Sequence, residues 1–341
     1  MRLLGAWKAL PGKASVGPLV AVARVDTPPP GLPEHTSGAR YQFARDEAEL
    51  REALKEAEIM FAWNFATGFG DPAIFRNTFA GATKLRWIHT AGVGVERLLF
   101  PELVASSVIV TNSGGVYEQS MAEYAMMLML QMAKDAVRTW EDQREHRWNF
   151  RRVETLEGRV LLVVGAGPIG RSIARLARAL RMEVIGVART RRDHDPDFGV
   201  IHPSSDLLGI VGGADYVLLV APLVAATTGL IGRDVFNRMK STARLINLGR
   251  GPLIDEAAFL EAMSDGRIAG AALDVYWDEP LPVGHPVWDL SNVIVSPHMA
   301  GDVTDTHERF VNGFLKNLER WMAGSSLLHV IDKSLGYISS A

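Results

Sequence analysis

The stretch VVGAGPIG, residues 163–170, decides the fold expected of this chain. Its three glycines form a G-x-G-x-x-G, with an apolar run, RVLLVV, leading into it and an amphipathic pattern, IGRSIARLARALR, following it. In that strand–turn–helix setting the motif lays the phosphates of a dinucleotide on a helix N-terminus. Glycine-rich turns without a ligand also join strands to helices, but the context favours binding. The predicted cofactor contacts in the turn are Gly165, Gly167, Pro168, Ile169 and Gly170.

Around the turn, short apolar runs alternate with helical patterns from about Val160 to Val295. Each run is bounded by Gly, Pro or Asp, as expected of buried strands separated by helices. This alternation predicts a doubly wound parallel sheet. The predicted strands are RVLLVV, MEVIGVA, YVLLVAP, ARLINLG, AGAALDV and NVIVSP.

The N-terminal third shows a weaker form of the same alternation. Its predicted strands are LVAVARV (near Val16–Val25), EIMFAW, LRWIHT and VIVTN, with a charged helix, RDEAELREALKEA, between the first two. The apolar segment 116–138 holds five of the twelve methionines, which at helical spacing are typical of core or subunit-interface packing. A last helix is predicted over 303–322, capped by Asp302. Its apolar residues are Phe310, Phe314 and Leu318 on one stripe, with Val311, Leu315 and Met322 beside them.

Composition limits the classes of protein that the chain can belong to. Its 341 residues suggest two domains, and 48% hydrophobic residues, 22% charged residues and a net charge of -3 are typical of a globular protein without a polyanion-binding surface. The absence of cysteine excludes disulfides, thiolate metal sites and cysteine nucleophiles, and it fits a cytoplasmic protein. The basic first 25 residues are interrupted too often for a signal sequence, and Met121–Met132 is too short to span a membrane. Nucleic acid, membrane and metal are not expected partners.

The end of the strand after the glycine turn predicts which dinucleotide binds. A site that prefers NAD commonly places an acid there to bind the ribose hydroxyls, but this chain has Ala188. The residues that follow, Arg189, Thr190 and Arg191, suit a doubly charged 2′-phosphate. NADP(H) is therefore the predicted cofactor, with NAD(H) as the alternative. A solvated basic loop with no ligand would have the same composition.

Three ionisable residues follow predicted strands at the edge where open parallel sheets bind ligands: Arg250, Glu279 and His298. An arginine can hold a substrate carboxylate by two hydrogen bonds and polarise the adjacent carbonyl. A histidine can give or take the proton of the oxygen, with a carboxylate to orient it and keep it protonated. Each residue alone could be a loop or turn residue, but the three together predict hydride transfer to a ketone.

The chain resembles the D-isomer-specific 2-hydroxyacid dehydrogenase family, and within it the glyoxylate/hydroxypyruvate reductases, over nearly its whole length. The segments that carry the resemblance are HTAGVGVERLL, TNSGGVYEQSMAEYAMMLML, LEGRVLLVVGAGPIGRSIARLA, DYVLLVAPLVAATTGLIG, FNRMKSTARLINLGRGPLIDEAAFLEAM, GRIAGAALDVYWDEPLP and NVIVSPHMAG. It implies that Arg250, Glu279 and His298 are catalytic. It also implies that the backbone N–H groups of Val93 and Gly94, in the loop Ala91–Val95, face the substrate. Asp274 would contact the nicotinamide carboxamide and Pro222 would line the cofactor cleft.

The resemblance further implies an α/β fold of two doubly wound parallel-sheet domains. A Rossmann cofactor domain, residues 116–301, would be inserted into a flavodoxin-like substrate domain, residues 1–115 and 302–341, with the active site in the cleft. A homodimer is expected, with Trp140 in a region that reaches towards the partner subunit in the family. Whether Trp63, Asn64, Trp277 and Trp288 shape the substrate pocket or serve packing stays open.

These expectations together predict an NADP-preferring reductase of small 2-oxo acids, such as glyoxylate or hydroxypyruvate, that forms the D-hydroxy acid. Formate dehydrogenases of the family have Gln where this chain has Glu279, because no proton is delivered there. The glutamate therefore favours ketone reduction. The alternative is a non-catalytic, dinucleotide-sensing protein like the corepressors that share the fold.

Overall fold

The computed structural model describes residues 17–23, 29–32, 38–63 and 73–338. Asn64 and the first 16 residues, including the start of the strand expected near Val16–Val25, lie outside the described residues. The chain divides into two compact units, Met1–Gly114 with His307–Ala341, and Gly115–Thr306. The domain boundaries predicted after residues 115 and 301 therefore differ from the observed ones, after Gly114 and Thr306, by one and five residues.

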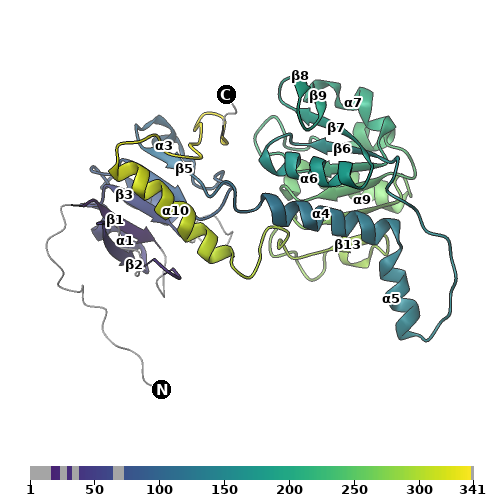
Figure 1. Cartoon of the computed structure of the whole chain (residues 1–341). Helices are drawn as coiled ribbons and strands as arrows, with labels where there is room; N and C mark the ends of the chain where they lie inside the picture. The colour runs from purple at the N-terminus through teal and green to yellow at the C-terminus, as the bar shows by residue number, and fades with distance from the viewer. Residues whose placement is uncertain (1–16, 24–28, 33–37, 64–72, 339–341) are drawn as a thin grey trace. The chain divides into compact units, whose positions relative to one another are not determined.

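The first unit holds a five-stranded, all-parallel sheet with the order β2-β1-β3-β4-β5 (Figure 1). This is the flavodoxin-like order, in which the chain winds outward in both directions from β1. Its strands are β1 Leu19–Ala23, β2 Arg40–Ala44, β3 Ile59–Ala62, β4 Trp87–Thr90 and β5 Ile109–Thr111. Its helices are α1 Glu47–Leu54, α2 Ala73–Phe79, α3 Pro101–Ala105 and α10 Thr306–Met322.

Aromatic packing joins α10 to this sheet. The ring of Phe314 stacks on Phe61 at 4.4 Å and on Trp87 at 5.6 Å between centroids. Five of the six apolar residues expected on the inner face of α10 are buried, but Met322 is 39% exposed because it ends the helix. Two predictions were wrong. The helix begins at Thr306 rather than 303, and Asp302 does not cap it. The reason is a tight turn just before the helix, in which the Thr306 hydroxyl accepts the Val303 N–H.

Strand β2 was not predicted, because RYQFA has no clear alternation and lies at the edge of the sheet, with only Ala44 buried. It stands between β1 and α1, so the charged helix does not follow the first strand directly.

The second unit holds an eight-stranded sheet with the order β13-β12-β11-β10-β6-β7-β9-β8. Every pair is parallel except β8 with β9, and the order on either side of β6 is that of a Rossmann domain. The strands are β6 Val160–Val164, β7 Glu183–Ala188, β8 Arg192–Asp195, β9 Gly199–Pro203, β10 Tyr216–Leu219, β11 Arg244–Asn247, β12 Gly270–Leu273 and β13 Val293–Val295. The fold class predicted from the sequence is confirmed, although the strands β8 and β9 were not foreseen.

Helices cover both faces of this sheet. Residues of α4 and α6 pack in one apolar cluster with the strand residues Leu161 and Val163, and residues of α8 and α9 pack in the cluster of the other face. The helices are α4 Glu118–Ala133, α5 Ala136–Arg144, α6 Pro168–Ala179, α7 Leu207–Ile210, α8 Arg233–Arg238 and α9 Glu256–Ser264, with short 3-10 turns at Ser204–Asp206, Val211–Gly213, Gly251–Leu253 and Pro286–Asp289. No helix in the described part of the chain is long and apolar enough to cross a membrane.

The methionine-rich segment is broken between α4 and α5. Asp135 takes a left-handed backbone conformation with φ 50°, which aspartate tolerates better than most residues. Its carboxylate accepts a hydrogen bond from Arg151 at 2.5 Å, and its carbonyl accepts a second at 2.8 Å. The chain therefore leaves the direction of α4 at this residue and continues as α5.

Candidate active site

The glycine turn joins β6 to α6, and close backbone contacts exclude a side chain at two of its three glycines. Gly165 has φ 116°, and a Cβ there would lie 2.6 Å from the Ala221 nitrogen of the neighbouring strand connection. A Cβ on Gly170 would lie 2.0 Å from the Gly165 carbonyl oxygen, so this glycine lets the helix approach the strand. A Cβ on Gly167 would meet open space. The N-terminus of α6 is thus accessible to a phosphate group, which fits a dinucleotide.

The basic loop after β7 lies next to this turn in the sheet order. Ala188 ends the strand, and Arg189, Thr190 and Arg191 are exposed. Arg191 pairs with Asp193 at 3.0 Å, with both side chains about half exposed. Arg192, whose contact was not foreseen, donates a hydrogen bond of 3.3 Å to the Ala166 carbonyl inside the glycine turn. Pro222, expected to line the cofactor cleft, is exposed in the connection that follows β10.

Arg250 lies in the loop after β11, and Asn247 shapes that loop. The Asn247 amide donates to the Arg250 carbonyl at 2.9 Å, and its oxygen accepts the Gly249 N–H at 3.0 Å. A Cβ on Gly251 would lie 2.0 Å from the Tyr276 carbonyl carbon, so the backbone after Arg250 packs directly on the loop that follows β12. Local hydrogen bonds and close backbone packing together bring Arg250 to the loop that carries Glu279.

Glu279 and His298 form a direct pair. His298 Nδ1 donates to Glu279 Oε2 at 2.7 Å, and Glu279 Oε1 accepts the Tyr276 N–H at 2.9 Å. Burial raises the pKa of Glu279, but hydrogen bonds from His298 and Tyr276 and the charges of His298 and Arg250 outweigh it, so the pKa lies below its usual value. An ionised Glu279 holds Nδ1, which leaves Nε2 of the imidazole free to act on a substrate.

The loop that presents His298 is held by Asp274. His298 has a left-handed backbone with φ 53°, which is uncommon for histidine. The buried Asp274 carboxylate accepts the N–H groups of the next two residues, Met299 at 3.0 Å and Ala300 at 2.9 Å, and the Ser296 hydroxyl at 2.6 Å. Burial raises the pKa of Asp274, and these hydrogen bonds lower it in part. Asp274, which was expected to contact the nicotinamide, therefore uses most of its hydrogen-bond acceptor sites to hold the loop that carries His298.

The strand order explains why these residues meet. β11, β12 and β13 are neighbouring parallel strands, so the loops that follow them lie at one edge of the sheet. Tyr276 joins two of these loops, because its hydroxyl donates to carbonyl oxygens of Leu273 at 2.7 Å and Ser296 at 2.9 Å, one at a time, and accepts the Ser296 N–H at 3.1 Å. The second unit thus brings Arg250, Glu279 and His298 together.

The loop Ala91–Val95 belongs to the first unit and follows β4. Val93 and Gly94 are partly exposed while their neighbours Ala91, Gly92 and Val95 are buried. Within the described residues no acceptor takes the N–H of Val93 or Gly94. Both groups can therefore serve a ligand.

Comparison with known proteins relates this geometry to a family. Residues 126–300, just over half of the chain, match the model of the D-isomer specific 2-hydroxyacid dehydrogenase, NAD binding domain. A glyoxylate reductase of Korarchaeum cryptofilum is 30% identical over 90% of this chain and 93% of its own length. The chain belongs to this family. As a 2-hydroxyacid dehydrogenase it is an enzyme that transfers a hydride between a nicotinamide dinucleotide and a 2-oxo or 2-hydroxy acid.

Two further relatives of this dehydrogenase are similar over most of their length. Glyoxylate/hydroxypyruvate reductase B of Serratia proteamaculans is 30% identical over 81% of this chain and 85% of its own length. The crystal structure of a D-isomer specific 2-hydroxyacid dehydrogenase of Xanthobacter autotrophicus Py2, in complex with NADPH and MES, has a TM-score of 0.77 and 27% identity, and the match covers 94% of this chain and 100% of that one.

The tryptophans considered for the substrate pocket of the dehydrogenase are engaged within their own units. Trp63 is 7% exposed and packs edge-on against Phe61 and Phe310. The indole N–H groups of Trp277 and Trp288 donate to carbonyl oxygens of Ile254 and Pro282. These contacts favour the packing interpretation for Trp63 and Trp277, whereas Trp288 is 51% exposed. Trp140 lies on α5 and is 59% exposed.

Apart from Asp274, which the resemblance implied as a cofactor contact, the residues that hold the functional loops were not singled out from the sequence. Asn247 and Asn112 each end or directly follow a buried strand, and each accepts the N–H of a glycine two residues later. An asparagine in that position, followed by glycine at the second residue, is a readable turn signal. Tyr276 and Asp274 offered no comparable signal, because their contacts join segments about twenty residues apart.

Proposed function

We propose that the protein reduces a small 2-oxo acid of the glyoxylate or hydroxypyruvate type to the D-2-hydroxy acid, with NADPH preferred over NADH. The observation that carries the proposal is the 2.7 Å pair of His298 and Glu279 beside Arg250 at one edge of the sheet. The substrate class is supported by relatives that are named glyoxylate reductase and glyoxylate/hydroxypyruvate reductase.

A bound nicotinamide dinucleotide supplies the hydride. Arg250 binds the substrate carboxylate through its planar guanidinium and polarises the adjacent carbonyl. His298 donates a proton from Nε2 to the carbonyl oxygen, while Nδ1 stays bonded to Glu279. Glu279, with its lowered pKa, stays ionised and stabilises the orientation of the ring. The N–H groups of Val93 and Gly94 bind the substrate carboxylate as well.

The second unit binds the cofactor in this proposal, and the first unit binds substrate. Gly165, Gly167, Pro168, Ile169 and Gly170 would hold the pyrophosphate at the start of α6, where the backbone is open. Arg189 and Thr190 would bind the 2′-phosphate, and Arg191 would join them by leaving its exposed partner Asp193. Asp274 accepts three hydrogen bonds, so one lone pair remains for the nicotinamide carboxamide. Pro222 would lie along the same cofactor.

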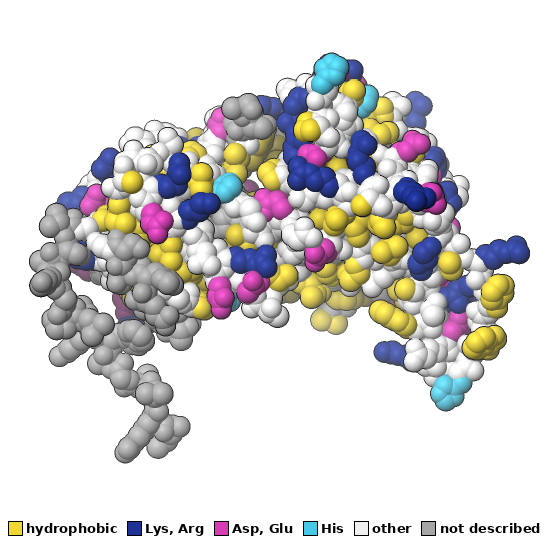
Figure 2. All heavy atoms as spheres, viewed as in Figure 1, with side chains coloured by type: hydrophobic (Ala, Val, Ile, Leu, Met, Phe, Trp, Pro, Cys, Tyr) yellow, Lys and Arg dark blue, Asp and Glu magenta, His cyan; other side chains and the backbone are white. Residues whose placement is uncertain are grey.

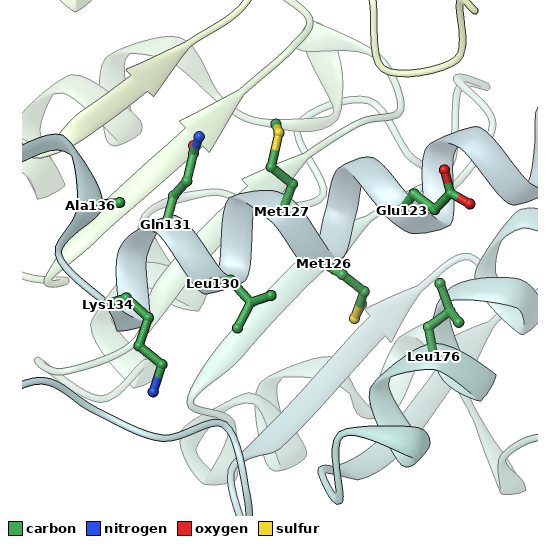
Figure 3. Close-up of a pocket in the computed structure, with 8 residues that line it drawn as sticks. All are labelled: Glu123, Met126, Met127, Leu130, Gln131, Lys134, Ala136 and Leu176. Atoms are coloured by element: carbon green, nitrogen blue, oxygen red, sulfur yellow. The ribbon is translucent and has the colours of Figure 1, made fainter. Parts of the chain in front are cut away.

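A homodimer in the cytoplasm completes the proposal, and an apolar surface on α4 supports the dimer. Hydrophobic side chains gather over α4 in Figure 2, where Met127 and Leu130 are each 38% exposed. Figure 3 shows the hollow they line, with Met126 and Leu130 on one side of α4 and Leu176 of α6 nearby. Val137 and Trp140 of the following helix α5 are exposed as well.

Steady-state turnover with a panel of 2-oxo acids tests the function directly. The oxidation of NADPH and NADH would be followed at 340 nm with glyoxylate, hydroxypyruvate, pyruvate and a bulkier 2-oxo acid, and the product configuration determined by chiral chromatography. We expect NADPH-dependent turnover of glyoxylate and hydroxypyruvate, and a D-product from hydroxypyruvate. Tight NADPH binding without turnover of any member would instead support the dinucleotide-sensing alternative.

A further inference from the structure

The loop Ala91–Val95 owes its shape to two carbonyl groups that are bound from inside the first unit. The Gly92 carbonyl accepts the Thr90 hydroxyl at 2.9 Å and the Ser113 N–H at 3.3 Å. The Val93 carbonyl accepts the side-chain amide of Asn112 at 2.7 Å. Two successive peptide groups are thus fixed by donors from one segment, Asn112–Ser113, and from Thr90.

Because the Gly92 and Val93 carbonyl groups are held in place, the geometry of the peptide bond fixes the direction of the Val93 and Gly94 N–H groups. In a planar trans peptide the C=O of one residue and the N–H of the next point in opposite directions. Binding the Gly92 carbonyl inside the unit therefore directs the Val93 N–H outward, and binding the Val93 carbonyl directs the Gly94 N–H outward. These are the two N–H groups that find no acceptor among the described residues. The donor that controls Gly94 is the amide of Asn112.

Asn112 is itself held rigidly. The residue is 2% exposed, its side-chain oxygen accepts the Gly114 N–H at 3.1 Å, and its own N–H donates to the His329 carbonyl at 3.2 Å. Both halves of its amide are therefore used, one inside its own turn and one on the substrate loop. An aspartate of the same shape would keep the first contact and lose the second, because a carboxylate has no N–H to donate.

A buried polar chain supports the same segment from behind. The Thr90 carbonyl can only accept, so the Ser113 hydroxyl donates to it at 2.9 Å and must accept from Nε2 of His89 at 3.3 Å. A His89 that carries its proton on Nε2 then accepts the Thr111 hydroxyl on Nδ1 at 2.8 Å. Thr111 accepts in turn from the Trp87 indole at 2.8 Å. The two hydroxyls and the imidazole each have one donor and one acceptor role, which fixes Ser113 next to Asn112.

We propose that Asn112 is a positioning residue for substrate binding, which acts by aiming the Gly94 N–H at the substrate carboxylate. The inference rests on the proposed function in so far as the ligand of the loop is a 2-oxo acid. Asn112 is buried and lies outside the Arg250–Glu279–His298 group. Through the Gly94 N–H it would affect the affinity for the carboxylate of the substrate, and it would not affect the affinity for the cofactor.

The test compares Asn112→Asp and Asn112→Ala with the wild-type full-length protein. KM and kcat would be measured with glyoxylate at saturating NADPH, and the Kd of NADPH by fluorescence. Loss of the hydrogen bond from the Gly94 N–H to the charged substrate carboxylate should raise KM by about 10- to 100-fold. We expect the Kd of NADPH to stay within about twofold, because the hydrogen-bond partners of Asn112 among the described residues, Val93, Gly114 and His329, all belong to the first unit.

Asn317→Ala is the matched control. Asn317 is 1% exposed in the same unit, and its amide likewise bonds to backbone, donating to the Leu328 carbonyl at 3.0 Å and accepting the Leu328 N–H at 2.8 Å. It should lose a similar amount of thermal stability and keep the wild-type KM. A wild-type KM in either folded Asn112 variant, or an equal rise in KM for Asn317→Ala, would overturn the inference.

Binding of oxalate, a dicarboxylate that is not reduced, separates this inference from the proposed function. Calorimetric titration of the NADPH-loaded protein should show oxalate bound about 10- to 100-fold more weakly by Asn112→Asp than by wild type. If wild type turned over no 2-oxo acid but oxalate binding still depended on Asn112, the proposed function would fail and the positioning role would stand. Equal oxalate affinity in both proteins would remove the positioning role while the proposed reaction could still be observed.

Discussion

His298 is the residue on which the proposed chemistry depends most. Its backbone is held at φ 53° by the Asp274 loop contacts, and its Nδ1 by Glu279. His298→Ala removes the proton donor and leaves the glycine turn untouched. Because general acid catalysis contributes about 10²–10⁴-fold, kcat should fall by that factor while the Kd of NADPH stays unchanged. Stopped-flow and steady-state measurement of NADPH oxidation provide the test.

His285→Ala is a suitable control for that experiment. His285 also pairs with a carboxylate, Glu256, at 2.9 Å in the same unit, and its ring stacks on Trp277. Removing it should cost stability and leave kcat near the wild-type value. Equal losses of kcat in the two variants would show that His298 matters only for folding.

Arg250 offers a second prediction at the same scale. Arg250→Ala leaves the substrate carboxylate without its charged partner and should cost on the order of 2–5 kcal/mol in transition-state binding. Arg250→Lys keeps the charge but not the two-pronged geometry, so it should recover only part of kcat/KM. Full recovery of kcat/KM by lysine would contradict bidentate binding.

His89 makes a prediction about pH. Burial, reinforced by the charge of His329, lowers the pKa of His89 to about 3, against about 6.5 in an unfolded chain. Between these values the unfolded state binds more protons than the folded state. Stability should therefore be complete above about pH 6.5 and decline as the pH falls towards 3, by up to about 1.4 kcal/mol per pH unit from this group.

Calorimetric melting of wild type and His89→Gln between pH 7 and pH 4.5 tests this expectation. The variant should be less stable at pH 7, because the polar chain is disturbed, but its melting temperature should fall less steeply on acidification. Parallel curves for the two proteins would mean that His89 does not contribute to acid destabilisation.

At the scale of elements, the loop after β7 should decide the choice of cofactor. Arg189→Ala removes a charge-assisted contact worth roughly 1.5–3 kcal/mol to a 2′-phosphate, which corresponds to about 10- to 150-fold in NADPH affinity. NADH, which has no such phosphate, should be affected little. Ala188→Asp should weaken NADPH by repulsion and strengthen NADH by binding the ribose hydroxyls.

The measurement is kcat/KM for both cofactors in wild type, the two loop variants and Arg178→Ala, which changes an exposed arginine on α6. Arg178→Ala should leave both values unchanged. A wild type that prefers NADH, or an Arg189→Ala variant that weakens both cofactors alike, would mean that the loop is only a solvated basic surface.

At the scale of the whole molecule, the exposed apolar surface of α4 predicts association of two chains. Leu130→Asp places a charge on that surface, where Leu130 is 38% exposed, and burying an unpaired charge in an interface is costly. We expect the molar mass measured by light scattering to change from dimer to monomer. Val283→Asp, at a valine that is 98% exposed elsewhere in the same unit, should leave the dimer intact. A monomeric wild type, or a dimeric Leu130→Asp, would contradict the prediction.

Local patterns in the sequence were sufficient for most elements of the fold. The strands around the glycine turn were predicted because each is a short, buried, apolar run between turn residues, and burial of parallel strands requires such runs. Two of the four edge strands do not obey that rule: β2 and β8 carry polar residues and were not predicted. The start of α10 was misplaced because the Thr306 turn depends on a single side-chain hydrogen bond.

The sequence by itself determined the fold class, the dinucleotide turn and the candidate residues Arg250, Glu279 and His298, because strand ends, glycines and ionisable residues are visible as local patterns. Only the tertiary structure decided how these residues are held. Asp274 bonds to residues 25 and 26 positions away, Ser113 meets His89 across two strands, and Asn112 reaches the Val93 carbonyl nineteen residues earlier in the chain. Such contacts follow from which strands are neighbours in the sheet, and a single sequence carries no periodicity that encodes them.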